Sequence, residues 1–225
     1  MENQKLDSEG YVILPAIVPA REVSTLLARL SALDLGPLRG GIRRIERQLP
    51  AVAALATAER LLNRVRPCLP GEPQLVRAIY FDKSPRNNWS VTWHQDRTVS
   101  VRQRFRAAGW KAWSVKAGAW HVQPPLAVLE NMATLRLHLD PADRENGCLK
   151  VLPGSHRKGV LAAAEMQVLV DRSEPVFCEV PAGGALMMRP LILHASEKVF
   201  NGKPRRVLHF EYSCHRLPEG IAWAA

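Results

Sequence analysis

The tripeptide His94-Gln95-Asp96 and the distant His194 carry side chains that can hold a metal ion. In an extended strand, alternate side chains point to the same side, so His94 and Asp96 can face one ion while Gln95 points away. Two imidazoles and one carboxylate bind ferrous iron on one face and leave coordination positions open for substrates. The tripeptide alone is a weak signal, but together with His194 and the pair Arg205-Arg206 it becomes a strong one. The sequence therefore predicts an iron site made by His94, Asp96 and His194.

The composition indicates one globular domain over residues 1–225. The chain is 47% hydrophobic and 23% charged, which suits a sizeable core. It has no apolar run of the roughly 20 residues that would span a bilayer, and its acidic start does not match a signal peptide. The four cysteines are dispersed without a CxxC motif, which favours free thiols in a reducing compartment. We therefore expect a cytoplasmic protein without a membrane segment.

The formal net charge of +10 comes from 31 Lys and Arg against 21 Asp and Glu. Such an excess can serve a nucleic acid, an anionic small molecule or only a solvated surface. The basic residues are spread over 43–47, 102–116, 150–158 and 203–206, and no zinc-finger or RNP-type motif accompanies them. Specific nucleic-acid binding is therefore an unfavoured prediction, and an anionic substrate or co-substrate explains part of the charge.

The elements around these residues have a mainly β pattern. Apolar residues at helical spacing predict helices over 20–34 and 50–66. From Gln74 onward, short apolar stretches are broken by Pro, Gly and Asn, as in all-β folds. The strands that we expect are Tyr11–Leu14, 74–82, 89–95, 133–140, 148–152, 176–180, 185–188, 191–194 and 205–213. The sequence thus predicts two helices packed on a sandwich or barrel of short strands, and not a parallel doubly wound sheet.

Two of these strands alternate between apolar and polar residues. In 134–140 the polar face carries Thr134, Arg136, His138 and Asp140. That face could be the wet side of a half-buried surface strand, or it could line the mouth of a barrel where ligands bind. The last strand repeats the pattern, with Arg205, Val207, His209 and Glu211 on one face and Arg206, Leu208, Phe210 and Tyr212 on the other.

The segment 97–125 mixes tryptophans with basic residues and directly follows the predicted ligand pair. It could fold over the iron as a lid whose aromatic rings exclude water and contact the substrate. Alternatively, the tryptophans could pack the segment onto the barrel, with the basic residues on its wet side. The candidates for the substrate pocket are Lys83, Trp93, Trp110, Trp113, His138 and His209.

The chain resembles the phytanoyl-CoA dioxygenase family of iron(II)- and 2-oxoglutarate-dependent oxygenases. The matching segments cover nearly the whole chain in the right order: GYVILPAIVPAREVSTLLARL, WHQD, DPADRENGCLKVLPGSHRKG, PAGGALMMRPLILHAS and PRRVLHFEYS. The resemblance implies a double-stranded β-helix (jelly roll) with N-terminal helices packed on one sheet and a long lid insertion at about 97–125.

The resemblance also implies roles for individual residues. His94, Asp96 and His194 match the iron ligands, and Arg205 matches the arginine that binds the far carboxylate of 2-oxoglutarate. A guanidinium can make two hydrogen bonds to that carboxylate. Arg206 competes for this role, but strand alternation allows only one of the pair to point inward. Further candidates for the co-substrate site are Thr134 and Arg136.

The implied activity is hydroxylation of a small organic molecule, with iron(II), 2-oxoglutarate and dioxygen consumed to give succinate and carbon dioxide. Anionic substrates (a carboxylate, a phosphate or a coenzyme A ester) are among the options. Halogenating members of this superfamily have a small residue in place of the carboxylate ligand, so Asp96 favours hydroxylation or a related oxidation such as desaturation. Two alternatives stay open: a metal-binding cupin-like isomerase or binding protein, and a basic nucleic-acid-binding protein.

Overall fold

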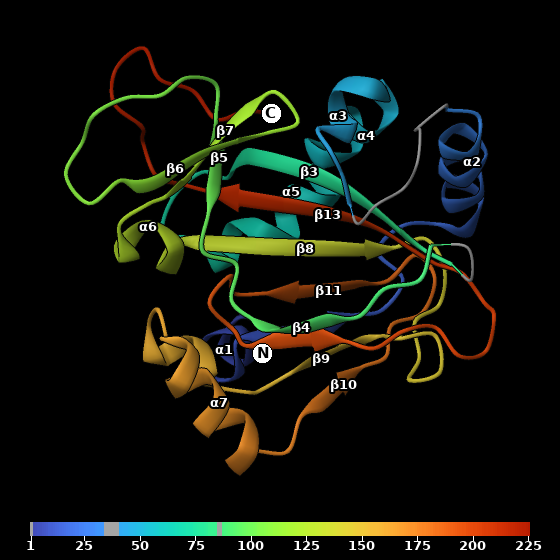
Figure 1. Ribbon diagram of the computed structural model, residues 1–225. Helices are drawn as coiled ribbons and strands as arrows, with labels where there is room; N and C mark the ends of the chain where they lie inside the picture. The colour runs from blue at the N-terminus through green and yellow to red at the C-terminus, as the bar shows by residue number, and fades with distance from the viewer. Residues whose placement is uncertain (1, 34–40, 85–86) are drawn as a thin grey trace.

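The computed structural model describes residues 2–33, 41–84 and 87–225, and two antiparallel sheets form its centre (Figure 1). The main sheet has six strands in the order β1-β11-β8-β13-β3-β2. Their bounds are β1 Tyr11–Leu14, β2 Gly41–Arg43, β3 Gln74–Lys83, β8 Met132–His138, β11 Ala185–Met188 and β13 Arg205–Ser213. The second sheet has the order β10-β9-β12-β4, with β4 Val91–His94, β9 Leu149–Val151, β10 Val176–Cys178 and β12 His194–Ser196. The two sheets form the predicted double-stranded β-helix.

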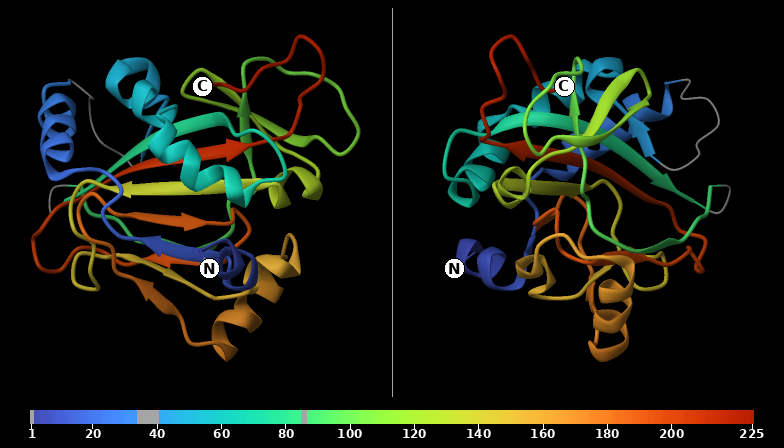
Figure 2. Two further views of the ribbon diagram at one scale, coloured as in Figure 1. Left: turned by 180° about the vertical axis from the view of Figure 1, so that it is seen from behind. Right: turned by 60° about the vertical axis from the view of Figure 1, so that its left-hand side comes forward.

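The N-terminal helices cover the outer face of the main sheet, as predicted, and the view from behind shows them lying across it (Figure 2). They are α1 Glu2–Glu9, α2 Ala20–Ser31, α3 Ile45–Gln48, α4 Pro50–Ala56, α5 Glu59–Val65 and the 3-10 turn Arg66–Cys68. The helix expected over 50–66 is two helices, because the chain breaks at Thr57-Ala58. Leu26, Leu55 and Leu61 of these helices join Leu137 and Phe210 of the sheet in one buried core.

Arg136 on β8 and Arg205, His209 and Glu211 on β13 lie between the two sheets. Every residue of β8 is buried, so the reading of 134–140 as a half-exposed surface strand is wrong. The leucines of β8 face the helices, and Arg136 faces the second sheet, where it lines a cavity. On both strands, alternate side chains therefore point to the hydrophobic core under the helices and to the cavity between the sheets.

The segment 97–125 forms a third, three-stranded antiparallel sheet beside the main one. Its strands are β5 Val99–Val101, β6 Lys111–Lys116 and β7 Ala119–Gln123, and the short helix α6 Leu126–Glu130 follows. Strand β6 turns into β7 through Ala117 and Gly118, which both have positive φ, as tight two-residue hairpin turns require.

Two further elements complete the described chain, the 3-10 turn Ser155–Lys158 and helix α7 Ala163–Arg172. The four cysteines are free, and Cys68, Cys148 and Cys178 are buried. Among the helices that the structure describes, none has the length and apolar character needed to cross a bilayer.

Candidate metal centre and active site

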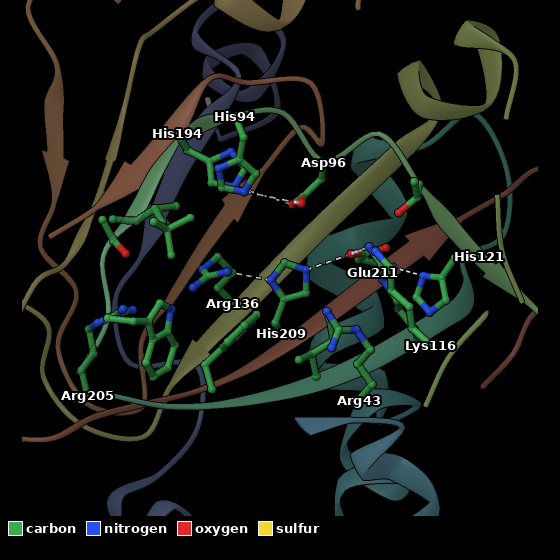
Figure 3. Close-up of a pocket in the computed structure, with 18 residues that line it drawn as sticks. Arg43, His94, Asp96, Lys116, His121, Arg136, His194, Arg205, His209 and Glu211 are labelled. Atoms are coloured by element: carbon green, nitrogen blue, oxygen red, sulfur yellow. Dashed lines mark hydrogen bonds and ion pairs between the residues drawn. The ribbon is translucent and has the colours of Figure 1, made fainter. Parts of the chain in front are cut away.

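His94 and His194 lie directly opposite each other on the antiparallel strands β4 and β12. Their ring centroids are 4.1 Å apart. The carboxylate of Asp96 lies 3.9 Å from Nε2 of His94 and 3.7 Å from Nε2 of His194. Figure 3 shows the three side chains pointing toward one another at the top of the cavity. The structure therefore brings together the three side chains that the sequence predicts as metal ligands.

The hydrogen bonds of the two imidazoles suit metal binding. Nδ1 of His94 donates to the carbonyl of Thr92, and Nδ1 of His194 donates to the carbonyl of Ile192, each over 2.9 Å. This arrangement puts the proton on Nδ1 and leaves the lone pair of each Nε2 directed at Asp96. Burial lowers the pKa of His194 to about 3, so this imidazole is neutral, which is the form that coordinates metals. The donor set thus fits a divalent cation such as iron(II).

Gln95 points away from this centre, as strand alternation predicts. Its side-chain nitrogen donates to the carbonyls of Gly159 and Leu191, each over 2.8 Å, and its oxygen accepts from the backbone N–H of Leu161. The buried amide thereby holds the ligand strand against the loops on its other side.

The ligands open onto a cavity of about 280 Å³. Its walls come from both sheets and from the segment 97–125. The residues that line it are Arg43, Arg77, Ile79, Phe81, Trp89, Val91, His94, Asp96, Thr98, Lys116, His121, Arg136, Leu149, His194, Ser196, Arg205, His209 and Glu211.

One end of the cavity is built by Arg205 and Arg136. Arg205 is only 3% exposed, and among the described residues its Nε and Nη1 have no hydrogen-bond partner. Burial, and then the nearby Arg136, lower the pKa of Arg205 to about 9, and burial lowers the pKa of Arg136 to about 10. Both values stay above neutral pH, so both guanidiniums are charged there. Burying a cation without a partner costs free energy, and a bound carboxylate could accept hydrogen bonds from the unused N–H groups of Arg205. This end therefore fits the co-substrate 2-oxoglutarate.

Two more basic side chains lie beneath this end without lining the cavity. Lys83 is buried and donates to Oγ of Ser196 over 2.9 Å and to the carbonyl of Glu197 over 2.6 Å. His138 is buried, and neither of its ring nitrogens has a hydrogen-bond partner within the described chain. Burial, and then Arg205 and Arg136, lower the pKa of both groups, to about 7 for Lys83.

A chain of hydrogen bonds runs along the middle of the cavity (Figure 3). Nη1 of Arg136 donates to Nδ1 of His209 over 2.7 Å, and Nε2 of His209 donates to Glu211 over 3.0 Å. Glu211 also accepts from Nη2 of Arg77 over 2.6 Å, and Nη1 of Arg77 lies 3.2 Å from Nδ1 of His121. The network fixes His209 as the tautomer protonated on Nε2 and leaves it no free ring nitrogen for a metal.

Several residues predicted for the pocket lie elsewhere. Trp110 and Trp113 pack with Phe105 against the core under the segment 97–125, and Trp93 packs against the buried cluster of Leu152, Leu161 and Leu193. These three tryptophans do not line the cavity, and their rings serve packing. Lys83, His138 and Thr134 are buried beside the cavity but do not line it. Of the six predicted pocket residues, His209 is in the wall.

Arg43, Arg77 and Glu211 also line the cavity, although the sequence did not predict them as functional candidates. Glu211 is on the same face of the last strand as Arg205 and His209, and this alternation was a usable signal. Arg77 is directly opposite Glu211 in the pairing of β13 with β3, a register that the sequence does not reveal.

Comparisons with known proteins identify the family of this chain. The family model described as phytanoyl-CoA dioxygenase (PhyH) matches residues 6–207. No curated protein matches the chain.

Solved structures with the same fold have low sequence identity to this chain. AviO1 from Streptomyces viridochromogenes Tue57 has a TM-score of 0.67 and 21% identity, over 96% of this chain and 95% of AviO1. SnoN, an α-ketoglutarate-dependent epimerase from nogalamycin biosynthesis, has a TM-score of 0.68 and 17% identity, over 100% of this chain and 84% of SnoN. HygX from Streptomyces hygroscopicus, with nickel, 2-oxoglutarate and hygromycin B bound, has a TM-score of 0.69 and 19% identity, over 94% of this chain and 86% of HygX. The family match, which spans most of the sequence, shows that this chain belongs to the phytanoyl-CoA dioxygenase (PhyH) family of enzymes that use non-heme iron(II), 2-oxoglutarate and dioxygen.

Proposed function

We propose that the protein is a dioxygenase that hydroxylates a small organic molecule and forms succinate and carbon dioxide as co-products. The observation that carries this proposal is the convergence of His94, Asp96 and His194 beside the buried guanidinium of Arg205 in one cavity. The carbonyl-bound Nδ1 atoms of both histidines orient their Nε2 atoms for a shared ion. The four free cysteines favour a cytoplasmic location for this enzyme.

Each of these side chains has a role that its surroundings support. His94, Asp96 and His194 would hold iron(II) and leave its opposite side open toward the cavity. The unused N–H groups of Arg205 would bind the far carboxylate of 2-oxoglutarate with two hydrogen bonds. Arg136 would add positive charge at the same end, where it is held by its contact with His209.

The metal and the co-substrates would supply the chemistry when bound, and the residues of the cavity would determine which reaction follows. Iron(II) with 2-oxoglutarate and dioxygen supplies an oxidant that can remove a hydrogen atom from an unactivated carbon. The apolar side chains of Ile79, Phe81, Val91 and Leu149 line the same cavity and would limit the access of water. The carboxylate of Asp96 occupies the position where a halogenating enzyme would need space for a halide, which favours hydroxylation.

A different oxidation of the substrate is the second candidate. It is favoured by the fold shared with SnoN and with SnoK, which is described as a carbocyclase, because such reactions use the same cofactors. Hydroxylation alone places an atom from labelled dioxygen in the product derived from the substrate, whereas succinate receives the other atom in both cases. Mass spectrometry of the substrate-derived product after a reaction under ¹⁸O₂ therefore separates the two.

The alternatives without oxygen chemistry make other predictions. A metal-binding isomerase or binding protein would not consume 2-oxoglutarate. A nucleic-acid-binding protein would need accessible basic residues and an affinity that falls steeply with salt. Arg77, Arg136 and Arg205 are instead buried, with their charged groups at a cavity.

One spectroscopic experiment tests the proposed function. Anaerobic addition of iron(II) and then 2-oxoglutarate should give the weak visible charge-transfer band of a chelated keto acid. His94→Ala should abolish the band. Loss of a residue that only hydrogen-bonds a metal ligand lowers metal affinity by about 10- to 100-fold, and loss of the ligand itself should lower it more. His215→Ala, which changes a histidine outside the cavity, is the matched control. Absence of the band in the unmodified protein would refute the proposal.

A further inference from the structure

A second group of basic side chains lies at the end of the cavity away from Arg205. In Figure 3, Arg43, Lys116 and His121 gather beyond Glu211, while Arg136 and Arg205 lie on the other side of His209. The metal ligands face the region between the two groups. Because Arg205 and Arg136 suit the co-substrate, the second group is left for the substrate.

This outer basic group is assembled from two segments that the fold ties together. Arg43 ends β2 and pairs with Ile79 of the main sheet, and Lys116 ends β6 at the tight turn into β7. The guanidinium of Arg44 donates to the carbonyls of Ala117 and Gly118 in that turn, over 3.4 and 3.3 Å. The contact holds the hairpin tip beside the strand that carries Arg43.

The charges of the cavity favour an anion at this end. Five cationic side chains line the described cavity (Arg43, Arg77, Lys116, Arg136 and Arg205) against two carboxylates, those of Asp96 and Glu211. Iron(II) and the dianion 2-oxoglutarate cancel each other, so an excess of positive charge remains when both are bound. Glu211 is engaged by Arg77. Within residues 2–33, 41–84 and 87–225, Arg43 and Lys116 form no ion pair.

His121 adds a neutral group to the same end. Burial, and then Arg77, Arg43 and Lys116 in that order, lower its pKa to about 4. The effect of these three cations on one imidazole indicates that their charges converge there. A convergent set of cations beside a partly apolar cavity is a site for an anionic group of a bound molecule.

We propose that Arg43 and Lys116 bind an anionic group of the substrate, a carboxylate or a phosphate, at the outer end of the cavity. The carbon to be oxidised would then lie between this group and the metal ligands, against Phe81 and Ile79. This inference rests on the proposed function and adds to it the class of substrate and the residues that select it.

The test uses protein loaded with manganese(II) and 2-oxoglutarate, because this paramagnetic ion speeds the nuclear relaxation of molecules held near it. The probes are inorganic phosphate, followed by ³¹P relaxation, and acetate, followed by ¹³C relaxation of its carboxyl carbon. We expect saturable relaxation with at least one probe, and its identity distinguishes a phosphate from a carboxylate. Arg43→Gln/Lys116→Gln should weaken that binding by about 10-fold or more.

Two matched variants complete the design. Arg29→Gln/Lys111→Gln removes the same charge from exposed positions outside the cavity and should leave anion binding unchanged. Arg43→Lys/Lys116→Arg keeps the charge and should retain most of the affinity. Equal affinity in Arg43→Gln/Lys116→Gln and the unmodified protein, or no saturable relaxation with either probe, would overturn the inference.

The failure of this inference is distinguishable from the failure of the proposed function. Arg43→Gln/Lys116→Gln should still give the charge-transfer band with iron(II) and 2-oxoglutarate, because both substitutions lie away from Arg205. A normal band with no anion binding refutes the inference alone, whereas no band in the unmodified protein refutes the function.

Discussion

Arg205 and Arg206 are neighbours in the sequence, but their guanidiniums lie on opposite faces of β13. Arg205 lines the cavity, whereas Arg206 makes two hydrogen bonds of 2.7 Å to the carboxylate of Asp140. Its hydrogen bonds to Asp140 raise the pKa of Arg206. Arg205 is thus available to bind an anion from outside the protein, whereas Arg206 is already paired with the carboxylate of Asp140.

This difference predicts separate effects for two alanine substitutions. Arg205→Ala should weaken 2-oxoglutarate binding by about 30-fold or more, because removing one partner of a buried charge pair costs roughly 2–5 kcal/mol. Arg206→Ala should leave that affinity unchanged and lower the free energy of unfolding by about 1–3 kcal/mol. Titration of the charge-transfer band and urea unfolding check the two effects. The reverse assignment of the effects would contradict our choice of Arg205.

Lys83 should make the stability of the protein depend on pH. Its pKa is about 7 in the folded protein, chiefly through burial, against an ordinary 10.5. Between these values the unfolded chain holds a proton that the folded protein has lost, so the free energy of unfolding rises with pH from about 7 upward. Relative to Lys83→Met, the unmodified protein should gain about 1 kcal/mol per pH unit between pH 7 and 9. Lys111→Met is the exposed control, and parallel curves for the unmodified protein and Lys83→Met would refute the expectation.

The buried pair of Arg77 and Glu211 should behave as a coupled unit. Glu211→Met should lower the free energy of unfolding by about 3–5 kcal/mol, because it leaves the guanidinium of Arg77 buried without its carboxylate. Arg77→Met/Glu211→Met should be less destabilised than Glu211→Met, since neither charge then remains buried alone. A double-mutant cycle from urea unfolding measures the coupling. Additive losses would show that the two side chains act independently.

The tryptophans of the segment 97–125 should matter for stability more than for substrate. Trp113 lies edge-on to Phe105, with ring centroids 5.3 Å apart. Trp113→Ala should lower the free energy of unfolding by roughly 2–3 kcal/mol, somewhat less than for a fully buried ring. Val115→Ala, at a side chain that is 57% exposed, should change it by less than about 0.5 kcal/mol. Thermal unfolding gives both values, and an unchanged stability for Trp113→Ala would contradict the packing role.

Much of the sandwich could be predicted from sequence because its strands are apolar runs or alternate between apolar and polar residues. The bounds of β1, β11 and β13 match the predicted strands, since each has a run of apolar or alternating residues with clear breaks. The metal ligands were predictable for a different reason: few residue types bind iron. The strand expected at 191–194 begins at His194, because the buried residues before it form a turn and make no strand pairing.

The sheet within 97–125 could not be predicted, because its stability depends on distant residues. Strand β6 is largely exposed, and β5 pairs with the chain near Trp223 through Val101. The core beneath it combines Val76 of the main sheet with Trp223 at the other end of the chain. Local patterns do not specify such contacts.

The straight run of β13 has a consequence for how substrates can vary. Arg205, His209 and Glu211 share one face of this strand. Because a strand rises about 3.3 Å per residue, the backbone positions of Arg205 and Glu211 lie roughly 20 Å apart along it. A shift of β13 by one residue in its pairing register would turn all three inward-facing side chains outward, so the spacing between them is fixed by the fold. A homologue that accepts a longer or shorter molecule must therefore differ at the opposite wall of the cavity, at the end of β2 and the hairpin tip at Lys116.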